Sequence, residues 1–153
     1  MAISKALADA IKEVLLQGNW VCNNLKDQLR EVNWQQATQQ LKGINTIALL
    51  TYHINYYIEG LVKVLQGGPL DIKDKFSFDM LPITSEAQWQ DLQDRLWNNT
   101  QKFSDLTEQL SDDQLLEAFA DAKYGTNYRN IAGIINHTYY HLGQIALLKK
   151  LTV

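Results

Sequence analysis

The chain has 153 residues, a length that one domain with its own hydrophobic core accounts for. Hydrophobic residues make up 46% of it and charged residues 20%, a composition that excludes an intrinsically disordered chain. The formal net charge is −3, the two signs are interspersed, and the densest basic cluster is Lys149-Lys150. Because a nucleic-acid interface needs a basic stripe that neutralises phosphates, we expect no nucleic-acid partner.

The N-terminal part of the chain predicts one long helix followed by a helical connector. Residues 3–17 place apolar side chains at helical spacing, as in an amphipathic helix. Weaker periodicity and a capping residue, Asn33, predict short helical pieces between residues 20 and 40. The start of the chain lacks a continuous apolar stretch, and no segment approaches the ~20 apolar residues of a membrane span. We therefore expect neither export nor membrane insertion.

The remainder of the chain predicts three further long helices. The predicted elements are a helix over 47–65, a loop over 70–83, a helix over about 85–110, a short turn over 111–119 and a helix over 128–151. Asn45 or Thr46 is the expected N-cap of the first of these helices, and Gly67-Gly68-Pro69 ends it. Ser85 and Ser111 each begin a capping box, with a glutamine three residues later.

Four long helices without an intervening linker predict an all-α fold, a four-helix bundle with long connections after the first and second helices. We expect this bundle to form a single domain over residues 1–153. The four tryptophans are expected to anchor the core or an interface; they are Trp20, Trp34, Trp89 and Trp97. The single cysteine, Cys22, excludes an intramolecular disulfide and favours a reducing cytoplasm. Its expected role is that of a small core residue, with a catalytic nucleophile as the alternative.

The three histidines of the chain have a spacing that suggests a metal site. His137 and His141 are four residues apart on the last predicted helix, and His53 lies in the middle of the second long helix. Residues four apart stack on one helix face, so two imidazoles there can reach one ion while a facing helix supplies the third. Three imidazoles leave coordination positions open to water, which is typical of a catalytic site. The alternative is that the spacing is accidental and the histidines are unrelated.

The same residues carry a resemblance to a known family. A mid-helix histidine at position 53, and His137 and His141 followed by Gly143-Gln144-Ile145, closely match the DinB/YfiT-like metal-dependent four-helix bundle proteins. The matching stretches are Ile47 to Gly67 and Tyr128 to Lys150, while chain length, helix order and loop positions agree over essentially the whole sequence.

This resemblance implies that His53, His137 and His141 bind one divalent ion, nickel or zinc above all. Characterised members of the family include transferases and isomerases that use low-molecular-weight thiols such as bacillithiol, mycothiol or glutathione. The resemblance also implies a small-molecule substrate, a homodimer and no role in DNA binding. We therefore expect a cytoplasmic metal-dependent enzyme, with thiol S-transfer as the leading reaction.

Other functions remain open from the residues alone. An ion held by three histidines can lower the pKa of a bound water or thiol, so it serves hydrolysis as well as thiol transfer. A hydrolase usually adds a carboxylate, yet Thr138, Tyr139 and Tyr140 separate the two histidines here. The alternatives are a metal-dependent hydrolase, a non-catalytic metal- or ligand-binding stress-response module, and a metal-free helical interaction protein.

Beyond metal-bound water, the sequence suggests no catalytic group, but three side chains are candidates for a supporting role. Gln144 is one turn beyond His141 and can orient it, or merely satisfy a helix contact. Tyr57 follows His53 by four residues, and Tyr140 follows His137 by three. Each tyrosine is expected to line a pocket or to pack in the interior of the bundle. Substrate contacts are expected from loops, among them residues 67–84.

Overall fold

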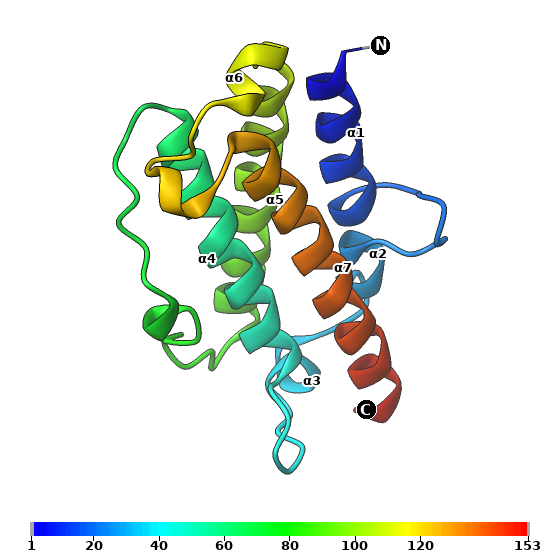
Figure 1. Ribbon diagram of the computed structural model, residues 1–153. Coiled ribbons are helices and arrows are strands. Elements are labelled where there is room, and N and C mark those ends of the chain that lie inside the picture. Colours follow the sequence, from blue (N-terminus) through cyan, green and yellow to red (C-terminus); the bar gives the residue numbers. More distant parts are fainter. Residues whose placement is uncertain (1, 153) are drawn as a thin grey trace.

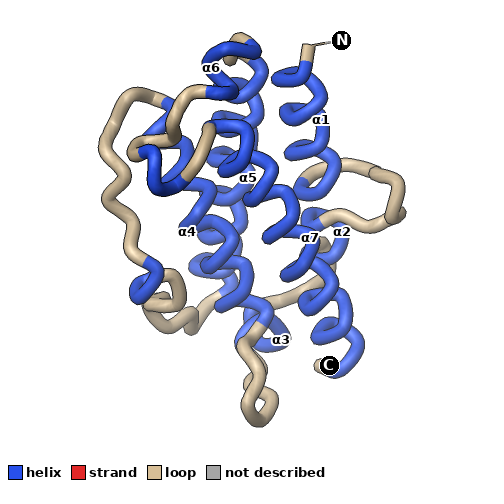
Figure 2. Tube along the Cα trace, in the orientation of Figure 1, coloured by secondary structure: helices blue, strands red, loops and turns tan. Residues whose placement is uncertain are grey.

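The computed structural model describes residues 2–152, and all regular secondary structure within them is helical (Figure 2). The prediction of an all-α protein is confirmed. The long helices are α1 (Ile3–Leu15), α4 (Ile47–Leu65), α5 (Glu86–Glu108) and α7 (Asn127–Leu151). Shorter elements occupy the connections; they are α2 (Leu25–Leu29), α3 (Trp34–Thr38), η1 (Asp74–Phe76), α6 (Asp112–Leu116) and η2 (Ala122–Tyr124). The connection between α5 and α7 is therefore also long, which the sequence interpretation did not state.

The four long helices pack side by side, each against two others (Figure 1). Helix α1 contacts α5 and α7, and helix α4 contacts the same two helices from the opposite side. The core between them holds large apolar side chains with no more than traces of exposure; among them are Ile11, Leu15, Ile54, Ile58, Trp89, Leu96, Phe103 and Ile131. Burial of each such side chain contributes about 1.5–3 kcal/mol to folding, so this core fixes α4 beside α7.

Hydrogen-bonding side chains define where the helices begin. The Thr46 hydroxyl accepts from the Leu49 amide at the start of α4, so Thr46 is the N-cap. The predicted capping box at Ser111 is confirmed in both of its hydrogen bonds. The box predicted at Ser85 is only half formed, because the Gln88 side chain accepts from the Thr84 amide at 2.7 Å instead of from Ser85. Ser85 is still the N-cap of α5, but the backbone amide that Gln88 binds belongs to the residue before it.

Among the tryptophans, which were expected to anchor the core or an interface, Trp89 lies in the core and Trp20 does not. Trp89 on α5 is fully buried and donates from Nε1 to the Val32 carbonyl at 2.7 Å. Trp20 is 95% exposed, because it lies in the turn between α1 and α2 rather than on a helix. Cys22, in the same turn, is exposed and has a φ of 53°, so its expected role as a core residue is also wrong.

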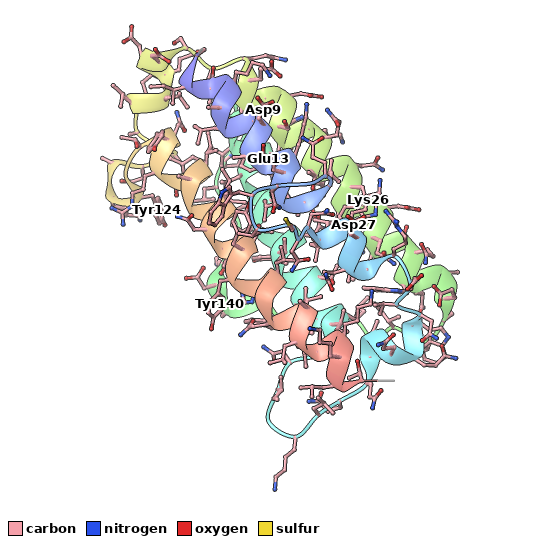
Figure 3. The ribbon with its side chains drawn as sticks, turned by 90° about the vertical axis from the view of Figure 1, so that its right-hand side faces the viewer. Asp9, Glu13, Lys26, Asp27, Tyr124 and Tyr140 are labelled. Carbon is pink, nitrogen blue, oxygen red and sulfur yellow. The ribbon has the colours of Figure 1, made fainter. Side chains whose placement is uncertain are left out.

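The outer face of α1 and α2 carries charges of both signs. Figure 3 shows Asp9 and Glu13 on α1 and Lys26 and Asp27 on α2 from this side of the molecule. Within α1, the Lys5 ammonium bonds the Asp9 carboxylate at 3.0 Å, an exposed i,i+4 pair of small energetic value. Among the helices of residues 2–152, none combines the length and the apolar character needed to cross a membrane.

Candidate metal centre

The packing of α4 against α7 brings the three histidines together. The His53 Nε2 atom on α4 lies 3.0 Å from the His137 Nε2 atom on α7. One turn further along α7, the His141 Nε2 atom lies 3.0 Å from the same His137 nitrogen. One ligand atom from each ring falls within 4.8 Å of the other two. The three histidines are therefore close enough to bind a metal ion.

The other ring nitrogens of two of these histidines have partners that determine their tautomers. The His53 Nδ1 atom lies 3.1 Å from the Ser77 carbonyl, and the His141 Nδ1 atom lies 2.7 Å from Gln144 Oε1. Both partners are oxygens that only accept, so each Nδ1 carries the hydrogen and donates it. In the neutral rings, both Nε2 atoms then keep a lone pair directed at the centre of the cluster, as metal-ligating histidines require.

This arrangement cannot be satisfied by hydrogen bonds within the cluster alone. The His137 Nε2 atom has at most one hydrogen, which it can donate to His53 or to His141 but not to both. One of the two 3.0 Å contacts would then bring two nitrogen lone pairs together. A shared cation removes this conflict because it accepts all three lone pairs. The donor set therefore fits a metal ion better than it fits three neutral histidines.

The spacing of the nitrogens also fits a common ion. Two nitrogens about 2.1 Å from one ion lie about 3.0 Å apart when their ligand directions are at right angles, and about 3.4 Å apart at the tetrahedral angle. Both contacts to His137 Nε2 measure 3.0 Å. Both distances to His137 are therefore compatible with ligand atoms that share one ion.

Burial keeps the cluster in the neutral form that binds metal. Burial, followed by the nearby charges of His141 and His53, lowers the pKa of His137 to about 4. Burial also lowers the pKa of His53, against the opposing effect of the Ser77 carbonyl. The pKa of His141 is lowered by burial too, and the bond to Gln144 opposes this shift. At neutral pH, metal binding therefore needs little proton release from these rings.

Aromatic side chains surround the three imidazoles. Phe78 stacks on His53 with ring centroids 3.9 Å apart and planes 5° from parallel. The Tyr57 ring meets the edges of His53 and His137 at centroid distances of 5.1 Å and 5.3 Å. Tyr140 lies 4.9 Å from His141 by the same measure. The site is thus bordered by aromatic groups from α4, α7 and the connection before α5.

The three supporting candidates from the sequence have different positions. Gln144 directly contacts His141, and Tyr57 packs against His53 and His137 while its hydroxyl donates to Asp74 Oδ1 at 2.9 Å. Tyr140 is 66% exposed and stands on the surface of α7 (Figure 3), so it does not pack in the interior. The structure brings Gln144 and Tyr57 to the histidines as side chains that can orient or border them.

The sequence interpretation missed the segment that supports His53. The Tyr56 hydroxyl bonds both the amide and the carbonyl of Lys73 at 2.9 Å, which holds residues 73–78 along α4. This contact places the Ser77 carbonyl and the Phe78 ring against His53. A backbone carbonyl has no signature in the sequence, but two aromatic residues in a polar loop, Phe76 and Phe78, were an available signal. The expectation that loop 67–84 contacts the substrate stays a prediction.

Comparison of the chain with protein-family models, with curated proteins and with solved structures finds no match. The fold and the site define an all-α protein with a cluster of three histidines that is able to bind a metal ion.

Proposed function

We propose that this protein is a metal-dependent enzyme of the DinB/YfiT-like kind, a single-domain four-helix bundle that binds a divalent ion through His53, His137 and His141. The observation that carries the proposal is the pair of 3.0 Å Nε2 contacts between rings whose tautomers direct lone pairs inward. Nickel and zinc both suit imidazole ligands. Nickel and zinc are therefore the two candidate ions.

The proposed reaction is thiol S-transfer to a small organic electrophile. A bound divalent ion would supply the acidity that converts a coordinated thiol to the thiolate nucleophile at neutral pH. The residues of the chain bind and orient. Ser77 and Gln144 hold two of the imidazoles, while Phe78 and Tyr57 shield the cluster from water. Such an aromatic border suits an uncharged organic substrate better than a strongly ionic one.

A carboxylate near the cluster is the specific observation that bears on hydrolysis. Asp74 lies near enough to His53 for its charge to oppose the lowering of the His53 pKa. Its Oδ1 atom accepts the Tyr57 hydroxyl, which competes with the task of activating a water. Thiol transfer needs no such base, so we place it ahead of the metal-dependent hydrolase. The non-catalytic binding module is the alternative if no turnover occurs.

The proposal is tested by combining metal analysis with a thiol assay. Metal content is measured after purification without affinity chromatography on metal resin, for the wild type, His53→Ala and His137→Ala. Asn136→Ala is the matched control, because Asn136 is an exposed neighbour of His137 on α7. We expect about one equivalent of metal in the wild type and the control, and a large loss in both histidine variants.

The nickel- and zinc-loaded proteins are then incubated with bacillithiol, mycothiol or glutathione and a panel of organic electrophiles. Metal-dependent consumption of a thiol that is lost in His137→Ala supports the transferase. Metal-dependent hydrolysis without thiol consumption supports the hydrolase, and bound metal without turnover supports the binding module. Equal metal content in the wild type and both histidine variants would contradict the metal centre itself.

A further inference from the structure

A second candidate site lies between α4, α5 and the connection that precedes α5. The structure has a cavity of about 510 Å³ there, within the ~300–1,000 Å³ typical of small-molecule sites. The three histidines are not among the residues that line it. Its lining residues are Tyr52 from α4, Asp79, Met80, Leu81, Pro82 and Ile83 from the connection, and Ala87, Gln88, Asp91, Leu92 and Arg95 from α5.

The body of this cavity is apolar. Four consecutive residues of the connection, Met80 to Ile83, line it together with Leu92 on α5. Leu81 is 85% exposed, so most of its apolar surface is open to solvent. A ligand that covers Leu81 would remove apolar surface from water, which stabilises the bound state.

Two of the polar side chains that line the cavity, Gln88 and Arg95, have partners within the protein. Gln88 Oε1 accepts from the Thr84 amide at 2.7 Å, and Arg95 Nε bonds the Asp91 carboxylate at 3.3 Å. The Asp79 carboxylate has no hydrogen-bond or ion-pair partner within residues 2–152. Tyr52 lines the same cavity. Burial, followed by the charge of Asp79, raises the pKa of its phenol. The exposed Asp79 and the phenol of Tyr52 therefore offer a carboxylate and a hydroxyl to a ligand.

We propose that this cavity binds a small organic amine, with a primary or secondary ammonium group on an apolar body. The ammonium N–H groups donate to the Asp79 carboxylate and to the Tyr52 oxygen, while the body contacts Met80 to Ile83. An anionic ligand is disfavoured, because two carboxylates and one guanidinium line the cavity. This site does not depend on the metal centre, and its failure would leave the proposed enzyme unaffected.

The test uses 2-phenylethylamine as the probe, with 2-phenylethanol as the uncharged probe of similar shape. Each is titrated into the isotope-labelled protein while backbone amide resonances are followed by NMR. We expect saturable shifts at residues 79–83 and 87–95, with the amine binding about fivefold more tightly than the alcohol, as for one partly exposed ion pair. Shifts at residues 137–144 report separately on binding at the histidines.

Two variants decide whether Asp79 is responsible. Asp79→Asn should remove the preference for the amine over the alcohol, while binding of the alcohol stays unchanged. Asp94→Asn is the matched control, an exposed carboxylate on α5 that does not line the cavity, and it should keep the preference. The proposal is overturned by amine shifts confined to residues 137–144, by equal affinity for the two probes, or by Asp79→Asn and Asp94→Asn behaving alike.

Discussion

Replacing Gln144 by leucine tests how far the tautomer of His141 controls metal binding. Leucine has a similar size but removes the oxygen that lies 2.7 Å from His141 Nδ1. Without that acceptor, the tautomer with hydrogen on Nε2 becomes competitive, and it has no lone pair for a metal. Residues that orient metal ligands contribute about 10- to 100-fold to affinity. Because Gln144 is only partly buried, water can replace some of its effect, and we expect a loss near the lower end, about tenfold or 1.4 kcal/mol.

The assay is competition for nickel and for zinc against a chromophoric chelator at pH 7.5. Gln144→Glu is the companion variant, since it keeps an acceptor oxygen at the same position and should retain most of the affinity. Thermal unfolding of the metal-free proteins should agree closely, which would separate an effect on the ligand from an effect on the fold. Affinity of Gln144→Leu within twofold of the wild type would refute the tautomer argument.

Three further predictions concern the fold and its pH dependence. Trp89→Ala should lower the free energy of unfolding by about 3–5 kcal/mol, whereas Trp20→Ala should change it by less than about 0.5 kcal/mol, as measured by urea denaturation. Because folding lowers the pKa of His137 from 6.5 to about 4, unfolding takes up a proton in this window. The free energy of unfolding of the metal-free protein is therefore retained above pH 6.5 and falls towards pH 4, by up to about 1.4 kcal/mol per pH unit. In urea titrations, His137→Gln should show a weaker dependence on pH. Gly133→Ala should raise the free energy of unfolding by about 0.5–1 kcal/mol and the melting temperature with it. The reason is that an added methyl group on this exposed helical residue meets nothing within 4 Å. A lower melting temperature would show that the glycine has a packing role.

The parts of the protein that follow helical periodicity were predictable from the sequence. The bounds of α4 agree with the predicted range of 47–65, because Thr46 and the Gly67-Gly68-Pro69 triplet mark its ends with distinct chemistry. The spacing of His137 and His141 by one helical turn was likewise readable. Their approach to His53 was a hypothesis only, because a pattern of apolar residues states which face of a helix is buried but not which helix covers it.

The parts that depend on loop conformation were not predictable in the same way. Ser77 supports His53 through a backbone carbonyl, a group that every residue has. Phe78 stacks on the same ring only because Tyr56 holds the preceding residues along α4. Trp20 was expected in the core or at an interface because large aromatic side chains are usually buried, yet it is 95% exposed in the turn between α1 and α2. Side-chain type is a weaker guide in loops than helical register is in helices.

The most direct test of the central claim is X-ray absorption spectroscopy of the metal that remains bound after purification. We expect three imidazole nitrogens at about 2.0–2.1 Å from the metal, together with further light atoms. We also expect one imidazole to be lost in His53→Gln, because the variant removes the ligand from α4 and leaves the two on α7. A first shell without imidazole, or a spectrum unchanged in His53→Gln, would contradict the three-histidine centre.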